Sequence, residues 1–420
     1  MRISMDKIIR AMSIALDLAQ MSSRNSGEKP IIENITNVDY SNHRFMHHSQ
    51  RTTYIALKIA NYLNLSGEEK REIYVVSLLH DIGAANTLTE SHYADEFIEK
   101  HCIVGANIIK PFPKFRRIPE IILYHHENFD GSGAMGLDGD LIPIESQIIR
   151  IADLVELLYK ENKPAFKQKD FIIDWVKRET SSIFSHKISE AFLHISSKDI
   201  FWFDLENIDF MDIILNREKP KFDIYIDLNN FEIISEIFAN IIDSKSSFTA
   251  KHSKGIAKLA YEVSRCIGYD CNKCKKMKIA GLLHDIGKLA IPLSILDKKG
   301  SLTPEEFEII KSHVYYTKII LDRIEDIPEI SIWASNHHEK LNGRGYPAGL
   351  TAESLSQESR ILGVCDIYQA LTEDRPYRDG LGRERALSIM KDMADNNFIC
   401  KDALNNLKDT LSASSDFDGL

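Results

Sequence analysis

One pattern of histidines and aspartates is written twice in this chain, and this repeat constrains the fold more than any other feature. The first set consists of His48, His80, Asp81, His101, His125, His126 and Asp153. The second set follows at offsets of 204 to 213 residues and consists of His252, His284, Asp285, His313, His337, His338 and Asp366. Core packing does not require imidazole at matched positions, because apolar side chains fill the same space at lower cost. Neutral imidazoles and carboxylates bind divalent transition metals, so each set is a candidate metal centre.

Helical periodicity surrounds the repeated residues. His80 and His284 each end a run with small or apolar residues three, four and seven positions earlier, so both are predicted to face a core. The capping box that starts at Thr303 predicts a helix that runs into His313. Gly83 and Gly287 follow the two His-Asp pairs and predict a left-handed helix end beside each pair. The predicted fold class is all-α.

Length and repeat offset together predict two tandem helical domains. A single core stops growing at about 250 to 300 residues, and the chain has 420. We expect the first copy over residues 1–160, a connecting segment over 161–227, the second copy over 228–395 and a tail over 396–420. The connecting segment is rich in aromatic residues, so we expect it to pack as helices between the copies rather than to form a flexible linker.

Composition excludes several classes of partner. A net charge of −10 argues against a DNA or RNA polymer. The sequence has no apolar run near 18 residues, and charged residues interrupt its first helical stretch, so we expect no membrane span and no export signal. Six cysteines are too sparse for a disulfide framework, which favours the cytoplasm. Cys271 and Cys274 form one CxxC without a second pair, so ordinary thiols are preferred to a zinc site.

Several ordered motifs follow one another in the second copy. They are Leu-Leu-His-Asp-Ile-Gly-Lys around His284, His337-His338-Glu339, Gly343-Arg344-Gly345-Tyr346-Pro347, and Asp366 followed by Arg375-Pro376-Tyr377-Arg378. Over about residues 230–395 the chain thereby resembles the HD-GYP branch of the HD phosphohydrolases. Members of this family are helical, hold two or three iron, manganese or similar ions, and hydrolyse cyclic dinucleotides. Most act on cyclic di-GMP, and some prefer 3′,3′-cyclic GMP-AMP.

The resemblance implies a division of the ligands between two ions. One ion would lie among His252, His284, Asp285 and Asp366. The second would lie among His313, His337 and His338, with Asp285 bridging the two. Two ions about 3.5 to 4 Å apart activate a bridging hydroxide for attack on phosphorus and clamp the phosphoryl oxygens. Iron, manganese, nickel and zinc all suit these ligands.

The same resemblance suggests substrate contacts. Lys288 is placed to meet a phosphate oxygen as charge develops, which makes Asp285 and Lys288 the candidate catalytic residues. The other candidate substrate-binding residues are Arg344, Gly345, Tyr346, Pro347, Arg375 and Arg378. Arginines bind phosphate or a guanine edge with two hydrogen bonds, and a tyrosine ring stacks on a base.

Departures from the family pattern refine these expectations. Phe248 stands where members with a third metal carry glutamate, so we expect two ions in the second copy. Asn342 replaces the usual aspartate, which leaves the base preference open. In the first copy Ala84 replaces the lysine, and the Tyr-Pro loop and the arginines are missing. A structural or regulatory half that keeps its metal ligands is favoured over a second active site, which stays an alternative.

The predicted function is metal-dependent hydrolysis of a cyclic dinucleotide to the linear 5′-phosphorylated dinucleotide. One alternative is a non-catalytic nucleotide sensor, against which the retention of Lys288 argues. The other is a general mononucleotide phosphohydrolase, against which the Gly-Tyr-Pro loop argues. A homodimer and a signalling protein partner both stay open.

Overall fold

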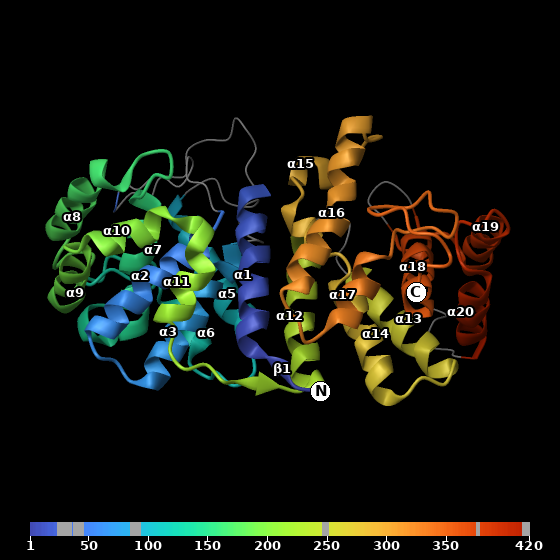
Figure 1. Cartoon of the computed structure of the whole chain (residues 1–420), viewed down its shortest axis with the longest axis horizontal. Helices are drawn as coiled ribbons and strands as arrows, with labels where there is room; N and C mark the ends of the chain where they lie inside the picture. The colour runs from blue at the N-terminus through green and yellow to red at the C-terminus, as the bar shows by residue number, and fades with distance from the viewer. Residues whose placement is uncertain (23–35, 37–45, 85–93, 246–251, 375–378, 414–420) are drawn as a thin grey trace. The chain divides into compact units, whose positions relative to one another are not determined.

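The structure is a computed structural model that describes residues 1–22, 36, 46–84, 94–245, 252–374 and 379–413. Within these residues it is built almost entirely of helices, which confirms the predicted all-α class (Figure 1). The chain divides into two compact units. One unit contains Met12–Ile224, and the other contains Met1–Ala11 together with Tyr225–Leu420.

The unit Met12–Ile224 contains the first copy of the pattern. Its α-helices are the greater part of α1 (Met5–Ser22), then α2 (His48–Tyr62), α3 (Gly67–Leu79), α5 (Ala94–Ile109), α6 (Ile118–Leu123), α7 (Ile144–Leu158), α8 (Lys169–Arg178), α9 (His186–Ser196), α10 (Asp199–Glu206) and α11 (Met211–Glu218). Short 3-10 helices join them: η1 (His80–Gly83), η2 (Gly139–Leu141), η3 (Ala165–Lys167) and η4 (Ile208–Phe210).

The other unit contains the second copy. Its helices are α12 (Leu228–Lys245), α13 (His252–Cys266), α14 (Cys271–Leu283), η5 (Ile286–Ala290), α15 (Leu293–Leu296), α16 (Pro304–Asp322), α17 (Pro328–Ser335), α18 (Gln357–Thr372), α19 (Arg383–Asp395) and α20 (Lys401–Ala413). Two short strands, β1 (Ile3–Ser4) and β2 (Tyr225–Ile226), pair antiparallel within this unit. The sequence did not suggest this grouping of the chain's first residues, and the division into four numbered stretches stays a prediction.

Each copy begins with a histidine at the start of an amphipathic helix. In α13 the side chains that share the inward face with His252 are Ile256, Leu259, Ala260 and Val263, and none of them is exposed. In α2 the side chains of Ile55, Ala56 and Ile59 are buried in the same way below His48. Burial of these apolar faces fixes the rotation of both helices, so both histidines point inward as the periodicity predicted.

Both His-Asp pairs lie at helix ends, as expected. His80 follows the last residue of α3, His284 follows the last residue of α14, and a 3-10 segment begins at each place. The predicted left-handed ends at Gly83 and Gly287 are wrong, because neither glycine has a positive φ. A Cβ at Gly287 would overlap the carbonyl of His313 on α16. These glycines therefore allow two helices to approach closely.

The predicted helix into His313 is present as α16. The Thr303 side chain accepts a hydrogen bond from the backbone of Glu306, and the Glu306 carboxylate accepts one from the backbone of Thr303. This capping box satisfies two N–H groups that a helix start leaves without partners. It fixes the first turn of the helix that carries His313.

The aromatic-rich segment folds as helices α8 to α11 and belongs to the unit of the first copy. Phe201 stacks on Tyr54 of α2 with ring centroids 5.7 Å apart. The Trp202 indole donates a hydrogen bond to the carbonyl of Ser196. The segment is thus a packed part of that unit, and its expected position between the copies stays a prediction.

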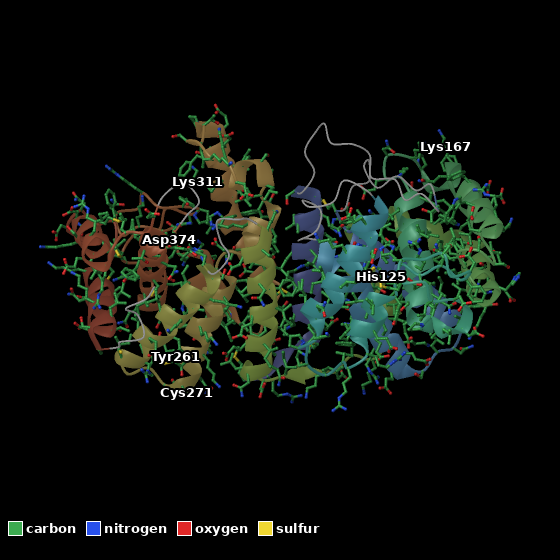
Figure 2. All side chains as sticks on the ribbon, turned by 180° about the vertical axis from the view of Figure 1, so that it is seen from behind. His125, Lys167, Tyr261, Cys271, Lys311 and Asp374 are labelled. Atoms are coloured by element: carbon green, nitrogen blue, oxygen red, sulfur yellow. The ribbon has the colours of Figure 1, made fainter. Side chains whose placement is uncertain are left out.

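The CxxC pair lies in the first turn of α14, where Cys271 is exposed and Cys274 is buried (Figure 2). Neither thiol belongs to any candidate metal cluster among the described residues. The preference for ordinary thiols stays a prediction. None of the described helices combines the length and the hydropathy that a membrane crossing needs.

Candidate metal centre and active site

The first predicted ligand group of the second copy converges on one point. His252 Nε2 lies 3.3 Å from Asp366 Oδ1 and 3.8 Å from Asp285 Oδ2. His284 Nε2 lies 3.0 Å from Asp285 Oδ2 and 4.0 Å from Asp366 Oδ1. All four side chains are buried. Ligands that each lie about 2.1 Å from an ion are separated by about these distances, so His252, His284 and Asp366 can share one ion with Asp285 beside it.

The second predicted group lies beside the first. His313 Nε2 is 3.3 Å from Asp285 Oδ1 and 3.5 Å from His337 Nε2. His337 Nε2 is 3.9 Å from the same aspartate oxygen. His338 is more exposed, and its Nδ1 lies 3.9 Å from Asp366 Oδ2. Asp285 Oδ2 thus faces the first group, and Asp285 Oδ1 faces the second. This is the geometry of a bridging ligand.

The tautomers of these histidines suit metal binding. The Nδ1 atoms of His284, His313 and His337 donate hydrogen bonds to backbone carbonyls at 2.8, 2.6 and 2.6 Å. Such bonds hold the proton on Nδ1 and turn the Nε2 lone pair toward the centre. Among the described residues, His284 Nε2 and Asp285 Oδ1 are buried without a hydrogen-bond partner. Buried polar atoms are rarely left so, and coordination of an ion would satisfy both.

The protonation states of the ligand side chains also suit a metal centre. Burial lowers the pKa of His313 to about 3 and that of His337 well below its usual value, so both are neutral at pH 7. Burial would raise the pKa of Asp285, but nearby His284 and Lys288 outweigh burial and lower it well below the usual value. Burial also lowers the pKa of His252, yet Asp366 and Glu373 raise it to about 9. A bound cation would displace that proton, as metal binding to histidine does.

Lys288 reaches the centre from the 3-10 segment η5. Its Nζ lies 2.6 Å from Asp285 Oδ2, and its side chain is 22% exposed. The ammonium therefore borders both the carboxylate and solvent. A substrate phosphate that approaches the centre from solvent would meet this charge.

The Gly-Tyr-Pro loop is tied to the same site. Tyr346 lies against His338 with ring centroids 4.9 Å apart. The Glu339 carboxylate accepts hydrogen bonds from the backbone N–H groups of Ala348 and Leu350 at 2.7 and 2.9 Å. A Cβ at Gly345 would overlap the backbone of Glu339. Gly345 therefore allows the loop backbone to pack closely against Glu339, and this packing holds Tyr346 beside the ligands.

A cavity of about 250 Å³ opens next to Tyr346 and His338. Apolar side chains contribute to its lining, among them Leu355 and Val364. The lining thus combines three aromatic rings (Phe307, Tyr346 and Phe398) and the two ligand histidines His337 and His338 with apolar side chains. Such a lining suits a flat heterocycle.

Other predicted residues are not brought to this centre by any described contact. Arg344 and Pro347 are exposed in the loop, and the backbone of Arg344 donates to Asn342 Oδ1 at 3.1 Å. Arg375, Arg378 and Phe248 lie outside the described residues. Their predicted roles stay predictions.

Sequence reasoning assigned no role to two carboxylates of this site. Glu373 Oε2 accepts a hydrogen bond from His252 Nδ1 at 3.0 Å and so orients the ring. Glu339 anchors the loop as described above. A signal for Glu339 was present in the sequence, because a glutamate follows the His-His pair in both copies as Glu127 and Glu339.

The first copy repeats the convergence of its ligands. His48 Nε2 lies 3.4 Å from both Asp81 Oδ2 and Asp153 Oδ1. His101 Nε2 lies 3.3 Å from His125 Nε2, and all these side chains except Asp81 are fully buried. The Glu127 carboxylate accepts two backbone hydrogen bonds from the loop that follows it, as Glu339 does.

Comparison with known proteins places the chain in a family. The sequence model of the HD domain family matches residues 32–171 and 236–399. A 3′3′-cGAMP-specific phosphodiesterase of Vibrio cholerae is 30% identical over 360 residues, which is 82% of this chain and 83% of that protein. A cyclic di-GMP phosphodiesterase of Pseudomonas aeruginosa is 35% identical over 150 residues, 36% of each chain.

The fold agrees with a solved structure. The crystal structure of a cyclic GMP-AMP-specific phosphodiesterase of Vibrio cholerae superposes with a TM-score of 0.68 and 22% identity, and covers 99% of both chains. The chain therefore belongs to the HD domain family, in the HD-GYP branch that its motifs resemble. The prediction of the family is confirmed.

Proposed function

We propose that this protein is a metal-dependent phosphodiesterase that hydrolyses 3′,3′-cyclic GMP-AMP to the linear 5′-phosphorylated dinucleotide. The observation that carries the reaction type is the position of Asp285. Its two oxygens face two separate groups of histidines, and Lys288 lies on its solvent side. Two adjacent ions, with a lysine ammonium beside them, suit the hydrolysis of a phosphodiester.

The ligands proposed for the two ions are those predicted. His252, His284, Asp285 and Asp366 would hold one ion, and His313, His337 and His338 would hold the other with Asp285 shared. Iron, manganese, nickel and zinc remain the proposed metals. When bound, two such ions supply an activated water and Lewis acidity toward the phosphoryl oxygens.

The side chains around the ions would bind the substrate. Lys288 would meet a non-bridging phosphate oxygen and stabilise the charge that gathers there. Tyr346 would stack on a base at the mouth of the cavity that it lines with His338. Arg344, Arg375 and Arg378 would bind the second phosphate or the guanine edge.

The choice of 3′,3′-cyclic GMP-AMP rests on how much of the chain each relative matches. Two relatives named as specific for this dinucleotide align with 82% and 71% of the chain, and so reach into both copies. The relatives named for cyclic di-GMP align with at most 39%. Similarity over both copies favours the substrate of the two longer matches.

A substrate panel tests this proposal. The purified, metal-loaded chain is incubated with 3′,3′-cyclic GMP-AMP, cyclic di-GMP, cyclic AMP and bis(p-nitrophenyl) phosphate, and products are identified by mass spectrometry. We expect linear pApG to form fastest. Faster formation of pGpG would contradict the proposed preference, and no turnover with metal confirmed would leave the sensor alternative.

A matched pair of variants tests the site. Asp285→Ala removes the shared ligand and should abolish hydrolysis, whereas Asp81→Ala makes the same change in the first copy and should leave measurable activity. Loss of activity in folded Asp81→Ala protein would contradict the proposed division between the copies.

All six cysteines are free, so we propose the reducing cytoplasm as the location. The homodimer and the signalling partner stay predictions.

A further inference from the structure

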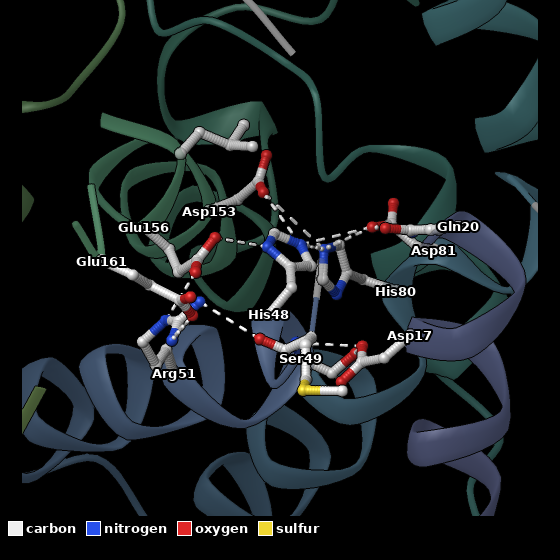
Figure 3. Close-up of polar contacts among 12 residues, drawn as sticks. Asp17, Gln20, His48, Ser49, Arg51, His80, Asp81, Asp153, Glu156 and Glu161 are labelled. Atoms are coloured by element: carbon white, nitrogen blue, oxygen red, sulfur yellow. Dashed lines mark hydrogen bonds and ion pairs between the residues drawn. The ribbon is translucent and has the colours of Figure 1, made fainter. Parts of the chain in front are cut away.

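The seven ligand positions of the first copy fall into two groups that differ in character. The first group consists of His48, His80, Asp81 and Asp153. In addition to the distances given above, His48 Nε2 lies 3.2 Å from His80 Nε2, and His80 Nε2 lies 3.3 Å from Asp81 Oδ2 and 3.8 Å from Asp153 Oδ1. Figure 3 shows the two aspartates beside the facing histidine rings. The ligand atoms of His48, His80 and Asp153 have the mutual spacing of side chains that share one ion, and Asp81 Oδ2 lies within ligand spacing of both histidines.

Outer partners hold three of the four ligands of this first group, and Figure 3 shows two of these partners, Gln20 and Glu156. His48 Nδ1 donates to Glu156 Oε2 at 2.5 Å, and His80 Nδ1 donates to the carbonyl of Ser77 at 2.9 Å. Both rings therefore turn the Nε2 lone pair inward. Gln20 donates to Asp81 Oδ2 at 2.6 Å and orients that carboxylate. Such partners fix the ligands of metal sites and raise their affinity.

The second group contains a cation of its own. Arg150 on α7 is 1% exposed, and its Nη1 donates to His126 Nδ1 at 2.8 Å. Its Nε and Nη2 donate to Asn128 Oδ1 at 3.2 and 3.0 Å. A guanidinium has no acceptor and stays protonated, so His126 Nδ1 must accept. The proton of neutral His126 then lies on Nε2, and neither nitrogen has a lone pair free for a metal.

The second copy has no such cation at this position. Arg150 corresponds to Gly363 at the offset of 213 that relates Asp153 to Asp366. A Cβ at Gly363 would already lie 2.9 Å from the carbonyl of His337. His338, the counterpart of His126, points its Nδ1 toward Asp366 Oδ2 instead. The same histidine nitrogen thus faces a carboxylate of the centre in one copy and a guanidinium in the other.

Cys102 lies within 4.8 Å of potential ligand atoms of His101, His125 and His126, but its sulfur is not placed for an ion bound by His125 Nε2. Its Sγ lies 3.7 Å from His125 Nδ1, the nitrogen that donates to the carbonyl of Ile122. The sulfur is therefore on the side of the ring opposite the Nε2 that faces His101. One ion cannot be bound by both the thiol and that Nε2 through the same ring.

We propose that the first copy binds a single divalent transition-metal ion through His48, His80, Asp81 and Asp153, and that the Arg150 guanidinium takes the place of a second ion. A fixed positive charge that occupies His126 opposes a second cation by repulsion and by loss of a ligand. A closed site with four protein ligands and one ion is typical of structural metal sites. The first copy then lacks the paired ions that diester hydrolysis uses.

Metal counting on the full-length chain tests this inference. Protein is loaded with excess Mn²⁺ and desalted, and Mn per chain is measured by plasma mass spectrometry. His48→Ala should lower the count of the parent by one, whereas His126→Ala should leave it unchanged. The matched variant in the second copy, His338→Ala, should lower the count or weaken retention of one ion. Arg150→Gly, which installs the residue of the second copy, should raise the count by one.

Each outcome decides. Loss of an ion in His126→Ala would show a second ion in the first copy and overturn the proposal. An unchanged count in His48→Ala would show that the first group holds none, with the same consequence. Folded Arg150→Gly protein with the parental count would refute the role of the guanidinium. Circular dichroism verifies folding, and if Arg150→Gly does not fold, the two histidine variants still decide the number of ions. None of these readouts depends on the substrate proposed above.

Discussion

Removal of the Lys288 charge is the sharpest test of the active site. Lys288→Met keeps an unbranched side chain of similar length but deletes the ammonium that lies 2.6 Å from Asp285 Oδ2. The side chain is only 22% exposed, so water replaces the lost charge incompletely. Asp285 keeps its histidine neighbours, and the centre should still bind metal.

The expected effect follows from the role of one charged donor. Loss of a single group that stabilises transition-state charge costs about 10²- to 10³-fold in turnover, or about 3 to 4 kcal/mol. We expect kcat for 3′,3′-cyclic GMP-AMP to fall by this factor with a smaller change in KM. Turnover is measured by chromatography of the linear product, and metal content is measured on the same sample.

Lys298→Met provides the matched control. Lys298 follows Lys288 in the sequence, but its Nζ pairs with the Glu306 carboxylate, 2.5 Å away, in the capping region of α16. Its loss should leave kcat within about twofold, since the pair is partly exposed, at 30% and 25%, and ion pairs near the surface contribute little. A Lys288→Met enzyme with full metal content and parental kcat would remove this residue from the mechanism.

Three further predictions concern the loop, stability and metal. Gly345→Ala forces a Cβ into the backbone of Glu339 and should destabilise the loop by about 1 to 3 kcal/mol, seen as a raised KM, whereas Gly382→Ala, where a Cβ meets no described atom within 4 Å, should not; equal KM values would contradict this packing argument. Burial lowers the pKa of Lys245 from 10.5 to about 7, so between these pH values the unfolded chain holds a proton that the folded chain has lost, and the free energy of unfolding rises with pH. Urea titrations at pH 7 and pH 10 should show a rise of at most about 5 kcal/mol in the free energy of unfolding of the parent, and Lys245→Met should remove that rise. An equal rise in parent and variant would refute the shift. Chelation should lower the Tm in calorimetry, because ions that bind only the folded state stabilise it by mass action, and Mn²⁺ should restore it; an unchanged Tm in metal-free protein would argue against both centres.

Ligand convergence was predictable from the sequence because it depends on spacing alone. Helical period fixes which side chains share a face, and a pattern written twice makes chance unlikely. His252, His284, Asp285, His313 and His337 therefore meet where their repeat placed them. The capping box at the start of α16 was equally local, since both of its partners lie within four residues.

Features that depend on packing were not predictable. Arg150 appears in the sequence as one of several polar residues of α7, and only the packing of this helix brings its guanidinium to His126. Glu156 orients His48, and Glu373 orients His252. The two glutamates follow Asp153 and Asp366 at different separations in the sequence, so the repeat did not reveal them. The role of Gly287 was misjudged because close approach of α16, rather than backbone conformation, requires a glycine there.

The pairing of β1 with β2 has a consequence for anyone who wishes to dissect this chain. Ile3 is in register with Ile226, and the amide of Ser4 donates to Asp326 at 3.0 Å. The unit that contains the second copy is thus assembled from two separate stretches of the chain, with Met12–Ile224 inserted between them. A protein fragment that starts at residue 228 would therefore lack both strands, β1 and β2, as well as the rest of Met1–Ala11.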